Sequence, residues 1–67
     1  MKRKNLIKFR IDKNLKSYQM AEKLGLTAPY YSNLENGKII NPKESVARRL
    51  EKEFEIDNGL YLLELVQ

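Results

Sequence analysis

Apolar residues recur every three or four positions through most of the chain, which is the spacing of amphipathic α-helices. No segment shows the strict alternation of apolar and polar residues that is typical of a β-strand. The pattern therefore predicts an all-α fold of five short helices. The inward-facing residues expected in the first, second and fourth of these helices are Leu6, Phe9, Arg10, Met20, Ala21, Leu24, Val46, Ala47, Leu50 and Phe54.

The corner between the second and third predicted helices is unusually abrupt. The first helix is expected at about residues 4–14 and the second at about residues 17–24. Gly25 ends the second helix because glycine adopts the left-handed conformation at little cost, and Thr27 caps the third helix through its hydroxyl group. The third helix ends in the same way at Gly37. So short a corner fixes the angle between the two helices that it joins.

The last third of the chain contains a helix start signal and a second apolar segment. In the start signal, Asn41 caps the fourth helix, Pro42 occupies its first turn and Glu44 reaches back to the cap. A fifth helix, short and apolar, is expected at about residues 58–65.

The length of 67 residues limits the chain to one domain with a small core. Because the chain has no cysteine, disulfides and thiolate metal sites cannot stabilise it, which makes a homodimer plausible on size alone. Lys8 directly follows the apolar pair Leu6 and Ile7, so neither a signal peptide nor a membrane-spanning segment is expected. We therefore expect a cytoplasmic protein with no membrane attachment and no metal.

The net charge of +4 is distributed unevenly along the chain. The first sixteen residues contain one acid, Asp12, and several basic residues, namely Lys2, Arg3, Lys4, Lys8, Arg10, Lys13 and Lys16. The other end of the chain is acidic. A basic face fits binding to a phosphate backbone, which is electrostatic and independent of sequence. Charge alone equally allows a solvated, lysine-rich helix without a partner.

The third predicted helix has two contrasting faces. Tyr31, Leu34 and Glu35 share one side. The opposite side is short, polar and uncharged, and consists of Ala28, Pro29, Ser32, Asn33 and Asn36. Small uncharged side chains allow a helix to enter the major groove of DNA, whereas a helix kept for solubility more often carries Lys and Glu outward. The alternative is an ordinary helical hairpin whose outward face is incidental.

A set of residues joins these features into the pattern A-x3-G-x8-LExG, with an arginine upstream and a proline downstream. Its members are Arg10, Ala21, Gly25, Leu34, Glu35, Gly37 and Pro42. With this pattern, the chain resembles the helix-turn-helix family of phage repressors and Cro proteins, the lambda-repressor-like or XRE family, from about Leu6 to Leu63. The resemblance implies a compact five-helix lambda-repressor-like domain that binds double-stranded DNA.

The resemblance also implies roles for individual residues. The positions that match those facing base edges in the family are Thr27, Ala28, Pro29, Ser32 and Asn33. Asn33 is the first candidate for a specific contact, because its amide offers a donor and an acceptor that match adenine N6 and N7. Ala28 and Pro29 offer apolar contacts that suit thymine methyl groups, which indicates an A·T-containing site. The candidates for contacts with the DNA backbone are Ser17, Tyr30, Asn36, Lys38, Asn41 and Lys43.

Arg10 and Glu35 match the family's ion pair, which ties the first helix to the end of the recognition helix. Each lies on the inward side of its own helix and needs an opposite charge there. The chain departs from the family at Ser17, where a glutamine usually bridges a phosphate and the recognition helix. If Ser17 itself caps the second helix, that helix starts one residue late and its reach toward a phosphate is shorter.

The segment LYLLELV near the end of the chain is too apolar for a helix that buries one stripe. We expect Leu62, Leu65 and Val66 to face a partner, and Leu60 and Leu63 to complete the core. The family usually dimerises here, so residues 58–67 are the expected dimerisation helix. Two-fold symmetry then places two recognition helices about 34 Å apart and predicts an approximately palindromic operator.

The combined interpretation is a homodimeric transcriptional regulator, a repressor from a phage, mobile element or stress-response locus, that needs no cofactor. An enzyme is not expected, because the chain has no histidine, no cysteine and no phosphate-binding glycine loop. The alternative function is a protein-interaction module, an antitoxin or antirepressor built on the same helical scaffold. Its support is the lack of long base-reading side chains around Ala28 and Pro29.

Overall fold

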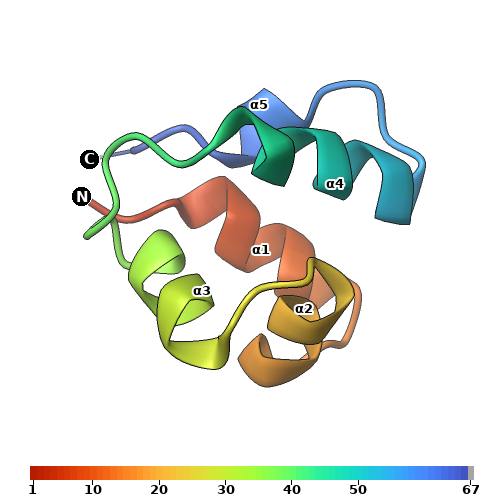
Figure 1. Cartoon of the computed structure of the whole chain (residues 1–67), viewed down its shortest axis with the longest axis horizontal. Coiled ribbons are helices and arrows are strands. Elements are labelled where there is room, and N and C mark those ends of the chain that lie inside the picture. Colours follow the sequence, from red (N-terminus) through yellow and green to blue (C-terminus); the bar gives the residue numbers. More distant parts are fainter. Residues whose placement is uncertain (67) are drawn as a thin grey trace.

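The fold consists of five short helices. The first helix lies between a pair formed by the second and third helices and a pair formed by the fourth and fifth. In the computed structural model, which describes residues 1–66, the helices are α1 (Lys4–Asp12), α2 (Ser17–Lys23), α3 (Ala28–Glu35), α4 (Glu44–Phe54) and α5 (Gly59–Leu62). Figure 1 shows α2 and α3 on one side of α1, and α4 and α5 on the other. Lys2 and Val66 add an isolated antiparallel β-bridge. The predicted all-α architecture is therefore confirmed, and no helix within residues 1–66 is long and apolar enough to cross a membrane.

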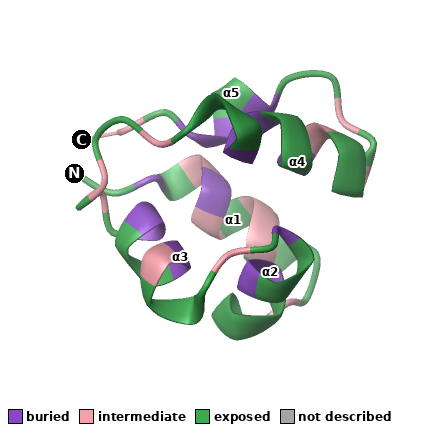
Figure 2. Cartoon of the chain, in the orientation of Figure 1, coloured by how far each residue is buried: buried purple, intermediate pink, exposed green. Residues whose placement is uncertain are grey.

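A cluster of apolar side chains fills the space around α1. Its buried members are Leu6, Met20, Ala21, Leu24, Tyr31, Leu34, Val46, Ala47, Leu50, Leu62 and Leu63. Figure 2 shows these positions on the sides of the helices that face the centre of the molecule. Phe9 of α1 and Phe54 of α4 close one edge of the cluster, with ring centroids 5.0 Å apart in an edge-to-face arrangement. The predicted inward positions are confirmed, with Phe9, Arg10 and Phe54 half-buried at the margin.

Two glycines end α2 and α3 as the sequence predicts. Gly25 and Gly37 have φ values of +69° and +77°, a conformation that costs other residues about 1 to 2 kcal/mol. Gly37 is also constrained by space, because a Cβ atom at this position would collide with the carbonyl oxygen of Met1. A Cβ atom at Gly25 would meet only the end of the Arg49 side chain at 3.9 Å, an ordinary van der Waals contact, so only its backbone conformation requires glycine.

The predicted cap of α4 is wrong, whereas α2 begins at Ser17 as predicted. Asn41 does not cap α4, because the N-cap is Lys43 and Pro42 precedes the helix. The chain bends at Ile40 and Asn41 and is extended at Lys43, and the carbonyl oxygen of Ile40 accepts a hydrogen bond from Arg3 Nη2 at 3.3 Å. Ser17 does not cap α2 either, since it is the first helical residue after the N-cap Lys16.

The end of the chain differs most from the prediction. Helix α5 covers only Gly59–Leu62, and Leu62 is buried at 5% exposure whereas Leu60 is 62% exposed. The reason is the close approach of Gly59 to the backbone of Ala47, which turns positions 59, 62 and 63 toward the core. The prediction that Leu62 faces a partner and that Leu60 completes the core is therefore wrong. Leu63 is buried as expected, Leu65 and Val66 are half-buried, and Gln67 lies outside the described residues.

Candidate nucleic-acid interface

Helix α3 presents its uncharged side to solvent. The five residues predicted to face base edges are all exposed, namely Thr27, Ala28, Pro29, Ser32 and Asn33. The Thr27 hydroxyl accepts a hydrogen bond of 3.3 Å from the backbone N–H of Tyr30, which confirms the predicted N-cap. Pro29 lies in the first turn, where its missing N–H has no helical partner to lose. The start of α3 is thus both capped and accessible.

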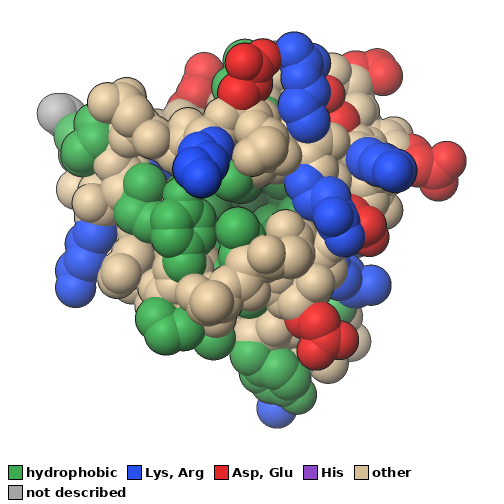
Figure 3. All heavy atoms as spheres, in the orientation of Figure 1, with side chains coloured by type: hydrophobic (Ala, Val, Ile, Leu, Met, Phe, Trp, Pro, Cys, Tyr) green, Lys and Arg blue, Asp and Glu red, His purple; other side chains and the backbone are tan. Residues whose placement is uncertain are grey.

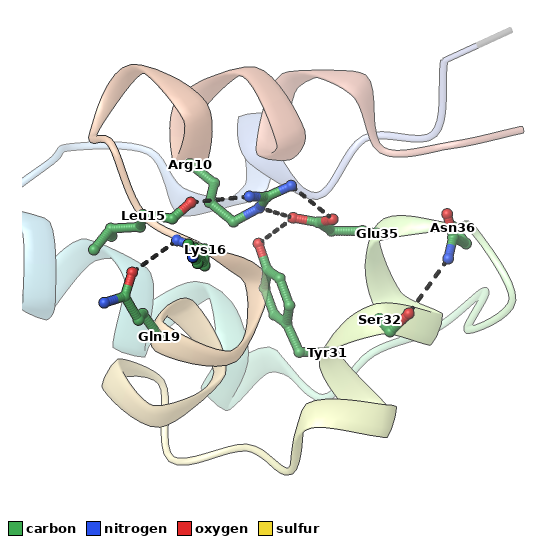
Figure 4. Close-up of polar contacts among 8 residues, drawn as sticks. All are labelled: Arg10, Leu15, Lys16, Gln19, Tyr31, Ser32, Glu35 and Asn36. Carbon is green, nitrogen blue, oxygen red and sulfur yellow. Dashed lines mark hydrogen bonds and ion pairs between the residues drawn. The ribbon is translucent and has the colours of Figure 1, made fainter.

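The six residues predicted to contact a DNA backbone lie in four places. Ser17 is in the first turn of α2, Tyr30 is in α3, two candidates follow α3, and two precede α4. The exposed candidates are Ser17, Asn36, Lys38, Asn41 and Lys43, whereas Tyr30 is half-buried. Among them, Asn36 is joined to the base-facing side, because its Nδ2 donates a hydrogen bond of 3.5 Å to the Ser32 hydroxyl (Figure 4).

The inward side of α3 is held by a polar cluster centred on Glu35 (Figure 4). Arg10 Nε lies 2.6 Å from Glu35 Oε2, and the Tyr31 hydroxyl donates to the same oxygen at 2.6 Å. Arg10 Nη1 donates to the carbonyl oxygen of Leu15 at 2.9 Å, so the guanidinium also fastens the turn that leads into α2. The side chains of Arg10 and Glu35 are only 16% and 10% exposed. This cluster fixes α3 against α1 from behind.

The same cluster shifts two pKa values. The hydrogen bond with Glu35 raises the pKa of Arg10, and burial followed by the hydrogen bond with Glu35 raises the pKa of the Tyr31 hydroxyl. Arg10 therefore stays charged and Tyr31 stays neutral at physiological pH. The predicted pairing of Arg10 with Glu35 did not include Tyr31, although its position four residues before Glu35 on one helix face signals a contact.

Gln19 caps the start of α2 from the third helical position, a different bond from the one considered for Ser17. The backbone N–H of Lys16 donates a hydrogen bond of 2.9 Å to Gln19 Oε1 (Figure 4). A glutamine at the third helical position is the usual partner of an N-cap N–H, and this spacing is the signal for it. The Ser17 hydroxyl therefore has no part in capping α2.

The basic segment at the start of the chain is less exposed than its composition suggests. Arg3 is buried, at 1% exposure, and Arg10 is paired with Glu35. The exposed cations of this segment are Lys2, Lys4, Lys8, Lys13 and Lys16. Lys13 Nζ lies 5.3 Å from the centre of the Phe9 ring, which suits a cation–π contact. Within this segment the lysines alone are thus available to a polyanion; the pairing of Arg10 with Glu35 was expected, whereas the burial of Arg3 was not.

Acidic side chains lie mainly away from α3. On the face shown in Figure 3 they gather chiefly over α4 and the segments beside it. Several of them are paired within α4, where Glu44 lies 2.8 Å from Arg48 and Glu53 lies 3.1 Å from Arg49. The outward side of α3 carries no charge of its own, so no fixed negative charge on this helix side opposes an approaching phosphate.

The tight corner at Gly25 joins α2 and α3. The inner side of α3 is held by the Glu35 cluster, and its outer side is exposed to solvent. Two helices joined by a turn as short as residues 24–27 form a helix-turn-helix unit. A family model described as helix-turn-helix matches residues 6–57, and the chain belongs to this family, the XRE or lambda-repressor-like group of DNA-binding helix-turn-helix regulators. Searches among curated proteins and among solved structures gave no significant match.

Proposed function

We propose that the chain is a homodimeric transcriptional repressor that reads a palindromic operator in the major groove of DNA. The observation that carries the proposal is the asymmetry of α3. Its outward positions 28, 29, 32 and 33 are exposed, small and uncharged, while Tyr31 and Leu34 are fully buried and Glu35 is nearly so. A helix of this kind is rigidly held and sterically free to enter a groove.

Each exposed residue of α3 has a chemical role in this proposal. The Asn33 amide donates to one edge atom of adenine and accepts from another, and Ala28 and Pro29 contact thymine methyl groups. Lys38 and Lys43, on either side of the segment that follows α3, neutralise phosphates and set the register of the protein on the duplex. The bound dimer then blocks access of polymerase to the operator.

The proposed dimer surface is an apolar groove between the segment before α4 and the end of the chain. It has a volume of about 440 Å³ and is lined by residues that include Ile40, Pro42, Leu60 and Leu65. Ile40 and Leu60 are 63% and 62% exposed and line the same groove, and adjoining exposed apolar side chains of this kind mark interaction surfaces. A second copy of the chain covers these residues in our proposal. Leu60 and Ile40 thus replace Leu62 at the interface, while Leu65 and Val66 keep the role predicted for them.

Two alanine variants test the base-reading role of α3. Asn33→Ala should cost about 1 to 3 kcal/mol on an operator selected from random duplex DNA, and it should relax the preference at one base pair. Lys43→Ala should weaken binding to all sequences alike, because it removes a phosphate contact. Lys52→Ala, another exposed lysine at the far end of α4, is the matched control for the lost charge. Equal losses on operator and random DNA for Asn33→Ala would contradict base reading.

The exposed apolar residues Ile40, Leu60 and Tyr61 also suit a second candidate function, a protein-interaction module on the same scaffold. The dependence of binding on salt concentration distinguishes the two candidate functions. Binding to DNA should weaken steeply between low and physiological salt because counterions are released, whereas an apolar protein interface should respond little. A complex that persists unchanged as salt rises favours the interaction module.

A further inference from the structure

Arg3, just before α1, is a buried arginine whose side chain binds three backbone carbonyl groups. Nε donates to the carbonyl oxygen of Leu63 at 2.8 Å, and Nη1 donates to that of Leu34 at 2.8 Å. Nη2 donates to the carbonyl oxygen of Ile40 at 3.3 Å. No acidic side chain among residues 1–66 forms an ion pair with this guanidinium, so backbone dipoles alone stabilise its charge.

These three carbonyl groups belong to three separate parts of the fold. Leu34 is in the last turn of α3, Ile40 is in the segment between α3 and α4, and Leu63 directly follows α5. Backbone bonds of the same segment reinforce the connection. The Arg3 N–H donates to the Glu35 carbonyl at 2.9 Å, and the Val66 N–H donates to the Lys2 carbonyl at 3.1 Å. Residues 2 and 3 therefore connect the end of α3 with the residues that follow α5. Figure 1 shows the first residues of the chain running close to its last residues.

The chemistry of this contact suits an arginine in particular. Carbonyl groups in the last turn of a helix carry partial negative charge, which attracts a cation to the end of α3. The guanidinium is planar and presents its donors in a rigid fork, so three bonds at once define where the three carbonyl groups lie relative to one another. A lysine has one nitrogen on a flexible stem and cannot impose the same geometry. Burial lowers the pKa of Arg3, so holding the charge there has a cost that an apolar residue would avoid.

Arg3 also touches the apolar groove that we assign to the second copy. Its side chain lines the groove together with Ile40, Leu60, Leu63 and Leu65, two of which offer the carbonyl groups that it binds. We infer that Arg3 is a positioning residue that sets the orientation of α3 relative to the dimer surface, and so determines which half-site spacing the dimer accepts. This inference rests on the proposed function.

The test uses the full chain and a series of operators whose half-sites are moved apart or together by one or two base pairs. Each added base pair rotates one half-site by about one tenth of a helical turn, which a rigid dimer cannot follow. The variants are Arg3→Met and, as the matched control, Arg48→Met, which makes the same exchange at an arginine that is 69% exposed. All proteins are compared where circular dichroism shows them folded and sedimentation shows them dimeric.

We expect wild type and Arg48→Met to prefer one spacing by on the order of tenfold, and Arg3→Met to distinguish the spacings by less than about threefold. Affinity for a single half-site should stay the same, which separates positioning from a general loss of structure. If Arg3→Met does not fold, Arg3→Lys takes its place, since it keeps the charge without the fork and should also broaden the spacing profile. A folded Arg3 variant with the wild-type spacing profile would overturn the inference alone. A wild-type protein that selects no symmetrical site would overturn the proposed function, and the inference with it.

Discussion

The ion pair of Arg10 and Glu35 should contribute far more to stability than the exposed ion pairs of α4. Arg10→Met keeps much of the side-chain volume but leaves the Glu35 carboxylate, which is 10% exposed, with the Tyr31 hydroxyl as its remaining side-chain donor. Removing one partner of a buried pair costs about 3 to 5 kcal/mol. Because the Arg10 side chain retains 16% exposure and Tyr31 still donates, the lower end applies. We expect the free energy of unfolding to fall by about 3 kcal/mol.

A loss of that size is easily measured in so small a protein. Proteins of this length unfold with about 3 to 10 kcal/mol in total, at roughly 0.05 to 0.15 kcal/mol per residue. Each kcal/mol lowers Tm by about 4 to 8 °C, so Tm should fall by roughly 12 to 24 °C. Urea titration followed by far-UV circular dichroism gives the free energy directly. If the variant is unfolded without urea at room temperature, thermal melts at lower temperature bracket the same loss.

Arg48→Met is the matched control, because it makes the same exchange at an exposed arginine that lies 2.8 Å from Glu44. Exposed pairs contribute at most about 1 kcal/mol, so this variant should stay close to wild type. The double variant Arg10→Met/Glu35→Gln should recover part of the loss, since no unpaired charge then stays buried. Equal losses for Arg10→Met and Arg48→Met would refute the assignment of the Glu35 cluster as the clamp on α3.

Three further predictions concern single residues. Gly25→Ala should lower the free energy of unfolding by about 1 kcal/mol because of the left-handed backbone at this position. Gly37→Ala should lower it further, because its Cβ atom also meets the Met1 carbonyl oxygen. Equal urea midpoints for the two variants would contradict this. Burial raises the pKa of Tyr31, so the stability linked to its neutral hydroxyl is fully present below the ordinary tyrosine pKa of about 10 and is lost as pH rises above it. Urea titrations at alkaline pH should therefore show wild type losing more stability than Tyr31→Phe, and parallel pH profiles would argue against this linkage. Leu60→Ala should weaken self-association in sedimentation with little change in stability, while Leu62→Ala should cost about 2 to 5 kcal/mol of unfolding free energy; the reverse pattern would mean that Leu62, not Leu60, faces the partner.

Features that depend on neighbouring residues could be predicted from the sequence. The glycine ends of α2 and α3 and the Thr27 cap follow from backbone preferences that act within a few positions. The division of α3 into a buried and an exposed side follows from helical periodicity, because its apolar and polar residues separate cleanly on a wheel. These local signals were sufficient to place α3 and its outward side chains.

Features that depend on distant contacts could not be predicted. In α5 nearly every residue is apolar, so periodicity does not distinguish Leu60 from Leu62, and the packing of Gly59 on Ala47 decides between them. Arg3 resembles its basic neighbours in sequence, yet two of its partners lie 31 and 60 positions away and are backbone carbonyl groups, which no side-chain pattern reveals. The same arginine binds the carbonyl oxygen of Ile40, next to Asn41, and this contact is equally absent from the local signals that predicted an Asn41 cap.

Base reading by the exposed side of α3, within a symmetric dimer, is the core of the proposed function. The most direct test is selection of random duplex DNA by the purified protein at about 150 mM salt, where nonspecific binding to phosphates is already weak. We predict enrichment of a two-fold symmetric site with A·T pairs in each half-site, and loss of preference at one of these pairs when selection is repeated with Asn33→Ala. A wild-type protein that enriches no sequence while remaining folded and dimeric would contradict the claim.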